Sequence, residues 1–282
     1  ITYIFKSDYI MEEINQVSFV NTKIASSLTP QNFKLEGSGK YSFNQLDFLD
    51  FELENNLNNK ITNLNLNFDY KNQVKIDLIN YKKSNGVIAN ISTHLEKNNS
   101  RINIKKLDYI ESKNFIKINN LSLKDNKFFL LEKLEIKTLN NNFSVQFKDK
   151  ILIKGTKFDA TNLPKIISNQ SGSKKFKNID NDIQIDFQNI IAPLSEKLQN
   201  FRLIGKIKEG SFVNISAKGD YGAGNFLDVS MKRDKKTNRK YLEVYSDLTR
   251  PLLTEYSFFN GLSGGKLIFT SLIDDDKSNS KL

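Results

Sequence analysis

The chain has 282 residues, of which 38% are hydrophobic, and this is enough to form a buried core in one large domain or in two ordinary ones. Lysine and arginine number 42 against 32 aspartates and glutamates, so the formal net charge is +10 and the surface should attract anionic partners such as nucleic acid, acidic glycans or lipid headgroups. The absence of cysteine and the presence of one histidine exclude disulfides, thiolate metal sites and any metal site built on two histidines.

The chain shows no recognisable leader or anchor. It begins without methionine and without a basic segment followed by an apolar one. Its longest apolar runs, such as residues 128–131, are far shorter than the roughly 20 residues that span a bilayer. We expect the chain to be an internal piece of a longer protein, with any signal or membrane anchor outside it.

Short helices are predicted at residues 7–17, 162–169 and 249–259. Ser7 or Asp8 is the expected N-cap of the first helix. Thr249 is the expected N-cap of the third, which carries Pro251 in its first turn. Most of the remaining chain shows a pattern typical of β-strands instead.

The strongest pattern is an alternation of apolar and polar residues, which places the apolar side chains of a strand on one face. Residues 63–70 show it in its simplest form, because every second residue is Leu, Phe or Tyr and the others are Asn or Asp. The same alternation recurs along most of the chain. The apolar residues that we select from it are Leu64, Leu66, Phe68, Val74, Ile76, Leu78, Ile102, Ile104, Ile116, Ile118, Phe143, Val145, Phe147, Ile183, Ile185 and Phe187.

Turn-forming segments rich in Asn, Asp, Gly and Lys separate these strands at intervals of roughly 8–14 residues. This spacing predicts an antiparallel meander, since βαβ units need helical crossovers between strands. The sequence therefore predicts a mostly β protein with a few short helices. Its apolar face can be hidden in a sandwich of two sheets, under a helix, or in a sheet curled into an open groove that holds a ligand with long hydrocarbon chains. Periodicity alone favours a packed sandwich core.

Three segments lack the requirements of the sites that they suggest at first sight. Residues 264–266, Gly-Gly-Lys, do not form a Walker A loop, because Asn260 and Leu267 replace its first glycine and its hydroxyl residue. Residues 219–224 are rich in glycine but lie between two predicted strands, where a hairpin turn is expected. His94 has no nucleophile or metal-ligand partner nearby in the sequence. We therefore expect no catalytic residue, no metal and no cofactor.

The second half of the chain carries a series of short motifs. An apolar strand with a Gly-x-x-x-Asp element precedes the helix predicted at residues 162–169. A strand that ends in Ser-Asp precedes the helix predicted at residues 249–259, which has paired leucines and leads into a Gly-x-x-Gly-Gly-x-Leu segment. The motif residues are Gly155, Asp159, Leu163, Pro164, Ser246, Asp247, Leu252, Leu253, Phe258, Phe259, Gly261, Gly264, Gly265 and Leu267. In these motifs residues 151–282 resemble the C-terminal region of the AsmA-like proteins of Gram-negative bacteria, the superfamily that includes the TamB and YhdP types.

The resemblance implies an architecture. Residues 1–150 would form the amphipathic strand repeats of a groove, and residues 151–282 would form an AsmA-like C-terminal β region that continues the first half. The whole would be a long antiparallel meander curled into an open, taco-shaped groove with a few short helices. Gly261 would end the helix at 249–259 as a left-handed cap, and Gly264 and Gly265 would turn the chain into the following strand.

The resemblance also implies a function. AsmA-like proteins are anchored in the inner membrane, extend through the periplasm and are associated with phospholipid transport that supports the barrier of the outer membrane. The implied partners are phospholipid acyl chains, the inner membrane through an anchor outside this chain, and envelope proteins. The sixteen apolar residues selected above would line the groove, and lysines at its lips would meet phosphates. The implied location is the periplasm, and no enzyme activity is implied.

Two other classes of function remain open. A structural or adhesive envelope protein would have similar strands but a closed, dry core. An enzyme acting on an acidic polymer would need carboxylates such as Asp69, Asp77 and Glu135 to be brought together by folding, and no spacing selects a pair among them. Nucleic acid is not an expected partner, because the few arginines are scattered instead of clustered with aromatic residues.

Overall fold

The computed structural model describes residues 5–7, 10–14, 16–125, 127–163, 165, 179–234, 239–253 and 264–273. The chain is mostly β, with long strands and a few short helices, as the sequence predicts. It divides into two compact units. Unit 1 comprises Ile1–Ile76 and Tyr81–Leu139, and unit 2 comprises Asp77–Asn80 and Asn140–Leu282.

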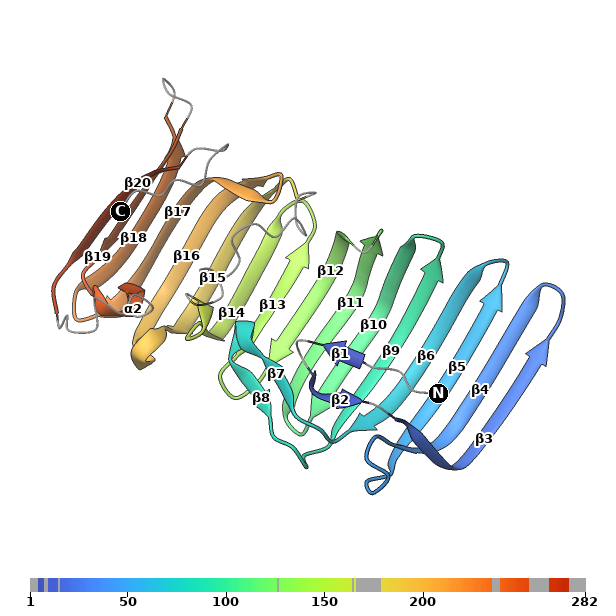
Figure 1. Cartoon of the computed structure of the whole chain (residues 1–282). Helices are drawn as coiled ribbons and strands as arrows, with labels where there is room; N and C mark the ends of the chain where they lie inside the picture. Colours follow the sequence, from blue (N-terminus) through green and yellow to red (C-terminus); the bar gives the residue numbers. More distant parts are fainter. Residues whose placement is uncertain are drawn as a thin grey trace. The chain divides into compact units, whose positions relative to one another are not determined.

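Unit 1 is built on an open antiparallel sheet with strand β3 at its edge (Figure 1). The strands, in order across the sheet, are β3 (Ser18–Leu28), β4 (Asn32–Ser42), β5 (Leu49–Asn58), β6 (Ile61–Tyr70), β9 (Ala89–Asn98), β10 (Arg101–Glu111), β11 (Asn114–Lys124) and β12 (Lys127–Lys137). We call this sheet the large sheet of unit 1. Except for the excursion between β6 and β9, the order across the sheet is the order along the chain, which is the predicted meander.

Tight turns built from residues with a positive φ angle join several of these strands. Asn59 and Lys60, with φ of 47° and 70°, form the turn between β5 and β6. Asn99, at 45°, lies in the turn between β9 and β10, and Asp125, at 51°, lies between β11 and β12. Asn and Asp enter this region of φ more readily than most residues, so the turn formers in the sequence mark the hairpins correctly.

A second, smaller sheet in unit 1 replaces the helix predicted at residues 7–17. Its strands, in order, are β1 (Phe5–Ser7), β2 (Ile10–Ile14), β7 (Val74–Ile76) and β8 (Tyr81–Lys83). The prediction of a helix was therefore wrong. Ile10 pairs with Val74, a residue far away in the sequence, and this tertiary pairing overrides the local helical preference of the segment.

Unit 2 is built on a second series of strands. They are β13 (Asn142–Phe147), β14 (Ile151–Asp159), β15 (Asn181–Ile191), β16 (Lys197–Lys208), β17 (Ser211–Gly222), β18 (Asn225–Arg233), β19 (Lys240–Ser246) and β20 (Leu267–Ile273), in that order across the sheet. Three short helical segments accompany them, namely η1 (Asp77–Ile79), η3 (Pro193–Ser195) and α2 (Arg250–Leu253). Of the helix predicted at residues 249–259, only the part that forms α2 lies within the described residues. Most of the helix predicted at 162–169 lies outside them.

One pair of strands in unit 2 departs from the predicted antiparallel meander. Strands β14 and β15 are parallel, with Ile151 opposite Ile183 and Asp159 opposite Ile191. A parallel pair needs a crossover of a dozen residues or more, and residues 160–180 supply that length. The sequence contains this long connection, but the direction of pairing is set only when β15 docks beside β14.

Gly155 allows close packing at this parallel pair. It lies opposite Phe143 on β13 and opposite Phe187 on β15. The two phenylalanine rings meet edge to face, with centroids 5.6 Å apart. A Cβ atom at position 155 would collide with Phe143 and lie 2.5 Å from the carbonyl oxygen of Asn142. The glycine of the Gly-x-x-x-Asp motif is therefore explained by packing.

Replacing Gly155 with valine should lower the free energy of unfolding by about 2 kcal/mol or more, because β13 must move to admit the side chain. Urea unfolding followed by circular dichroism would measure the loss. Gly37→Ala is the matched control, since its Cβ would meet nothing nearer than Phe51 at 3.7 Å. Equal losses in the two variants would show that the close approach of Phe143 does not decide the effect.

Candidate functional site

The apolar side chains of unit 1 form rows that run across the large sheet. Residues paired on neighbouring strands point to the same face, so the pairing registers define the rows. Row 1 is Leu64, Leu95, Ile104, Leu121 and Leu131; row 2 is Leu53, Leu66, Thr93, Leu107, Ile118 and Leu134; row 3 is Phe51, Phe68, Ile91, Tyr109, Ile116 and Ile136. The predicted lining residues in these rows are Leu64, Leu66, Phe68, Ile104, Ile116 and Ile118, and Ile102 lies on the same face beside row 1.

A register shift in β10 keeps the rows continuous. Ile104 and Leu107 are three residues apart, so regular alternation would place them on opposite faces. The shift lies between Ile104 and Lys106 and inserts one extra residue, which puts both apolar side chains on the same face. Alternation in the sequence ends at Ile104, and for this reason it did not reveal Leu107 and Tyr109.

Burial changes along the strands of unit 1. At the row 3 end Tyr70 and Ala89 are almost fully buried, with 3% and 0% of their surfaces exposed. In rows 1 and 2, Leu64 and Leu66 are only half-buried, although Leu64 has the apolar partner Leu95 on β9 and Leu66 has the apolar partner Leu53 on β5. At the far end of the strands Leu28 is 79% exposed. The apolar face is therefore packed at one end and accessible toward the other.

Strand β8 contributes buried side chains to the packed end of the apolar face, beside row 3. The Lys83 ammonium is buried, lies 5.5 Å from the centre of the Tyr70 ring and donates to the carbonyl oxygen of Val87 at 2.6 Å. Burial lowers the pKa of Lys83. The Tyr81 and Tyr109 hydroxyls are 2.9 Å apart, and burial raises the pKa of Tyr109 to about 12. These polar groups are satisfied inside the packed end, which makes them structural.

The face of unit 2 is packed more completely. Phe187 and Ile183 are 5% and 6% exposed. Phe187 belongs to a core cluster with Ile190, Leu198 and Leu227, and the predicted residues Phe143 and Ile185 pack against it. Val145 and Phe147 on β13 are half-buried. Around Phe187, then, the predicted lining residues form a closed core.

Three predicted lining residues lie neither in the large sheet of unit 1 nor in the long strands of unit 2. Val74 and Ile76 belong to β7 in the small sheet of unit 1. Leu78 was expected to continue a strand, but it lies in η1 and is 52% exposed. The alternation of residues 74–78 thus reflects a short strand followed by one helical turn.

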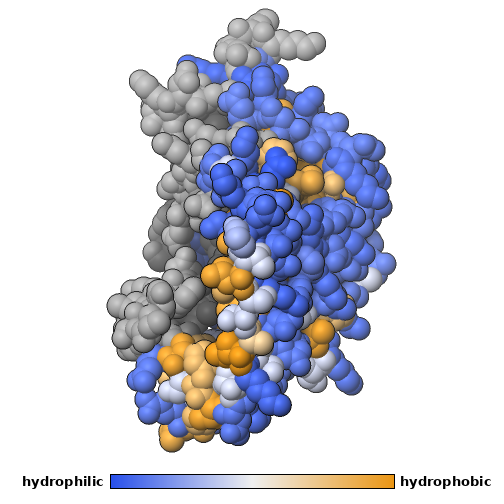
Figure 2. Space-filling model, turned by 90° about the vertical axis from the view of Figure 1, so that its right-hand side faces the viewer, coloured by the Kyte–Doolittle hydropathy of each residue, from blue (hydrophilic) through white to orange (hydrophobic). Residues whose placement is uncertain are grey.

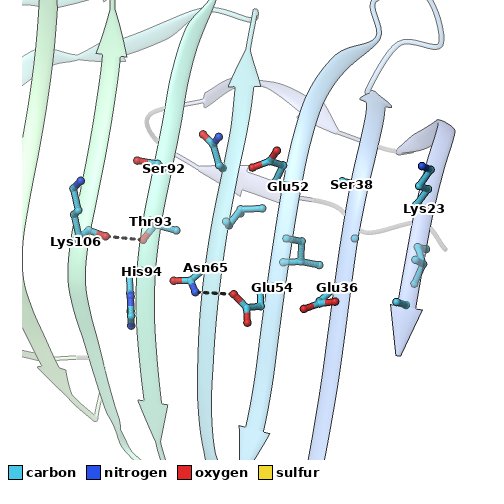
Figure 3. Close-up of a pocket in the computed structure, with 16 residues that line it drawn as sticks. Lys23, Glu36, Ser38, Glu52, Glu54, Asn65, Ser92, Thr93, His94 and Lys106 are labelled. Carbon is cyan, nitrogen blue, oxygen red and sulfur yellow. Dashed lines mark hydrogen bonds between the residues drawn. The ribbon is translucent and has the colours of Figure 1, made fainter. Parts of the chain in front are cut away.

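A shallow cavity of about 670 Å³ crosses the large sheet of unit 1 (Figure 3). Its lining includes the polar residues Lys23, Glu36, Ser38, Glu52, Glu54, Asn65, Asn67, Ser92, His94 and Lys106, together with Ile24, Ala25, Gly37, Leu53, Leu66 and Thr93. Glu54, Asn65 and His94 are opposite one another on β5, β6 and β9. The Asn65 amide donates to Glu54 at 3.3 Å.

The alternation does not predict this cavity, because it assigns the polar members to solvated positions between apolar ones. It presents amide, carboxylate, imidazole and ammonium groups in a row, an arrangement suited to hydrogen bonding. Its charges are partly neutralised, since the Lys34 ammonium lies 2.5 Å from Glu36. Within the described part of the chain, no three His, Asp or Glu side chains come together in a way that could hold a metal ion.

The carboxylates considered for an enzyme occupy separate elements. Asp69 on β6 accepts a hydrogen bond from the Asn90 amide at 3.0 Å. Glu135 on β12 forms an ion pair with Lys133 at 2.9 Å. Asp77 lies in η1, which belongs to unit 2. The large sheet places β9, β10 and β11 between Asp69 and Glu135, so these two do not form a pair.

Comparison with family models, with curated proteins and with solved structures finds no match to this chain. Among the described helices, none has the length and apolar character needed to cross a bilayer. Figure 2 shows that the described residues on the face drawn there are largely hydrophilic, with hydrophobic residues gathered in separate patches.

The carboxylate of Asp159, in the Gly-x-x-x-Asp motif, is the centre of a hydrogen-bond network in unit 2. It is 2% exposed and accepts hydrogen bonds from the side-chain amides of Asn80 at 3.0 Å and Asn140 at 3.2 Å. The backbone N–H and the hydroxyl of Thr161 donate to its other oxygen at 3.1 and 2.6 Å. The buried Asn141 amide donates to the carbonyl of Ile79 at 2.8 Å. This network attaches η1 to β14.

The Gly-Gly-Lys segment at residues 264–266 is a turn. Gly264 and Gly265 have φ of 75° and 88°, and the Thr249 hydroxyl donates to the carbonyl of Gly265 at 2.9 Å. The Lys266 ammonium lies 2.9 Å from Asp247, so its charge is already paired within the protein. Gly261 and the predicted helical residues 254–259 lie outside the described residues, whereas Leu252 packs on the core cluster and Leu253 is half-buried.

Asp247 should make the stability of unit 2 depend on pH. Hydrogen bonds from the Tyr245 hydroxyl, the Phe226 backbone N–H and Lys266 lower its pKa from 3.8 to about 2. A lowered pKa means that the unfolded chain takes up the proton first, so the stabilisation is full above the unfolded pKa and is lost as the pH falls toward 2. The urea midpoint should therefore decrease less in Asp247→Asn than in the unmodified chain when the pH is lowered from about 5 to about 2.5. An unchanged pH profile would contradict this role.

Proposed function

We propose that the chain is a non-enzymatic lipid-binding protein that takes part in phospholipid transfer between the inner and outer membranes of a bacterial envelope. In this proposal the acyl chains lie on rows 1 and 2 of unit 1, and the chain belongs to the AsmA-like proteins that its second half resembles. The observation that carries the proposal is a continuous apolar face whose central residues, Leu64 and Leu66, remain only half-buried.

The energetics of such a face suit an acyl chain. Each methylene group removed from water contributes about 0.8 kcal/mol, so a long hydrocarbon chain on this face is strongly favoured over water. The rows offer leucine or isoleucine on most strands, and adjacent strands lie about 4.8 Å apart. Movement from one strand to the next therefore exchanges similar contacts, which keeps the barrier to sliding low. Transfer on such a surface needs no catalytic residue.

A structural or adhesive envelope protein is the second candidate. It is favoured by the core cluster of unit 2, where Phe187, Ile190 and Leu198 are packed as in an ordinary domain core. If the apolar face of unit 1 is also dry and closed in solution, this second function is the better one. The two candidates differ in one measurable property, the presence of bound lipid.

Native mass spectrometry of the chain purified from a bacterial periplasm, followed by solvent extraction and lipid analysis, tests the proposal. We expect masses that correspond to the protein with one or more phospholipids and recovery of those lipids in the extract. Detection of the lipid-free mass alone, with no phospholipid in the extract, would overturn the proposal and favour the structural protein.

A further inference from the structure

A group of three polar residues interrupts the apolar face of unit 1, on the side of row 1 away from the packed end. Asn55 on β5 lies opposite Leu64 of row 1. Thr62 on β6 is two residues from Leu64 and lies opposite Lys97 on β9. Paired residues point to the same face, and so do residues two apart on a strand, so all three lie on the face that carries the leucines. They lie toward the β5–β6 and β9–β10 turns (Figure 1).

Asn55 is not explained by the packing around it. Its side-chain oxygen is buried and accepts no hydrogen bond from the residues that the structure describes. Leu35 and Leu64 lie opposite it on the two neighbouring strands. A polar group in apolar surroundings lowers stability unless it is hydrogen-bonded. Thr93 in row 2 meets this requirement, since its hydroxyl donates to the carbonyl oxygen of Lys106 at 3.1 Å.

Asn55 can nevertheless serve a ligand. The residue as a whole is half-buried, like the leucines of rows 1 and 2. The last side-chain torsion of asparagine is broad, so the amide can turn either its oxygen or its NH₂ group toward a bound molecule. A polar residue that costs stability at its position is the kind that is found at functional sites.

Lys97 gives this part of the face a positive charge. It is exposed, and it is the only charged residue on this face of β5, β6 and β9, strands that are described throughout. Glu96, its neighbour in the chain, points to the other face and lies 3.7 Å from Lys105. An ammonium at the border of an apolar surface suits a ligand that joins an anionic group to hydrocarbon.

On the basis of the function proposed above, we propose that Asn55, Thr62 and Lys97 bind the headgroup of an anionic phospholipid whose acyl chains lie on rows 1 and 2. The Lys97 ammonium and the Thr62 hydroxyl donate to phosphate oxygens. The Asn55 amide, which lies closer to the leucines, donates to the ester group that joins the acyl chains. Strand spacing places the Cα atoms of Asn55 and Lys97 about 12 Å apart, and the two side chains and a glycerophosphate group fill that distance.

Charge complementarity selects the class of lipid. The face of β5, β6 and β9 offers an ammonium and no carboxylate. The amine of a zwitterionic headgroup therefore finds no anionic partner there, whereas a headgroup with a net negative charge meets Lys97 without an unpaired cation. Phosphatidylglycerol has this chemistry and serves as the probe.

Lipid binding by charge variants tests the headgroup site. The chain is incubated with radiolabelled phosphatidylglycerol or with diacylglycerol, which lacks the phosphate, and the dissociation constant is obtained from the lipid retained on gel filtration. Lys97→Gln should raise the constant for phosphatidylglycerol about fivefold, the size expected of an ion pair at an exposed position, and leave that for diacylglycerol unchanged. Lys124→Gln is the matched control, because Lys124 is also exposed and lies at the same end of the sheet on its other face.

The headgroup site and the proposed function can fail separately. Phosphatidylglycerol binding that Lys97→Gln weakens no more than Lys124→Gln would overturn the headgroup site and leave lipid binding in place. A chain that binds neither lipid would overturn both. Displacement of phosphatidylglycerol by inorganic phosphate at millimolar concentration would mean that the site binds a soluble phosphate, and the assignment to a lipid headgroup would be wrong.

Replacing Asn55 with leucine gives an independent readout. The urea midpoint, followed by circular dichroism, should rise, because the variant removes an unbonded polar atom from apolar surroundings. Binding of both lipids should nevertheless weaken about fivefold through loss of the hydrogen bond to the ester group, although leucine adds apolar surface. A lower midpoint would identify Asn55 as a structural residue, and tighter lipid binding would exclude it from the site.

Discussion

Replacing Leu64 and Leu66 with aspartate should strip phospholipid from the chain. Both leucines lie in the half-buried part of the apolar face, in rows 1 and 2, so the substitutions place two charges where the acyl chains are proposed to lie. Burying an unpaired carboxylate against hydrocarbon is strongly unfavourable. We expect bound lipid, measured by extraction and native mass spectrometry, to fall at least about tenfold, which corresponds to about 1.4 kcal/mol.

The matched control places the same charges on the other face of the same strand. Asn63→Asp and Asn67→Asp alter residues that alternate with Leu64 and Leu66 on β6, and they should leave the lipid content unchanged. Lipid retained in the leucine variant would exclude rows 1 and 2 as the binding surface. If the leucine variant unfolds, Leu66→Gln, which adds no charge, gives the milder form of the test.

Replacing Asp159 with alanine should destabilise unit 2 by about 2–5 kcal/mol. The buried carboxylate accepts four hydrogen bonds, and its removal leaves the part-buried donors of Asn80, Asn140 and Thr161 without this acceptor. The loss should appear as a lower urea midpoint in circular dichroism. It should also release η1, which increases hydrogen exchange at the backbone amide of Asn80, now bonded to the carbonyl of Asp77 at 3.1 Å.

An exposed aspartate on the neighbouring strand β15 provides the control for this prediction. Asp182 lies at the start of β15 and is exposed, so Asp182→Ala should change the free energy of unfolding by less than about 0.5 kcal/mol. A small loss for Asp159→Ala, similar to that of Asp182→Ala, would mean that the hydrogen-bond network around η1 contributes little to stability. The Gly-x-x-x-Asp motif would then lack the structural role that we assign to it.

Much of the fold could be predicted from local patterns. The alternation in residues 63–70 placed Leu64, Leu66 and Phe68 on one face, and the strand is present as β6. The turn at Asn59 and Lys60 and the glycine turn before β20 also follow from residue types that adopt a positive φ. These features depend on neighbours within a few residues, which is the range that a sequence pattern can report.

Other features depend on partners far away in the chain, and local patterns did not reveal them. Residues 10–14 became a strand because Ile10 meets Val74, and β14 and β15 became parallel through a long crossover. The polar cavity of unit 1 was missed because Glu54, Asn65 and His94 come together only across three strands. No spacing in the sequence encodes that alignment.

The sequence by itself determined which side chains share a face, because a strand alternates with a period of two whatever surrounds it. Tertiary structure alone decided how much of that face is covered. Phe187 and Leu66 have the same alternating pattern, yet Phe187 is packed among Ile190, Leu198 and Leu227 while Leu66 stays half-buried. Burial depends on which elements pack against the face, and those elements are separated from it in the sequence and brought together only by folding.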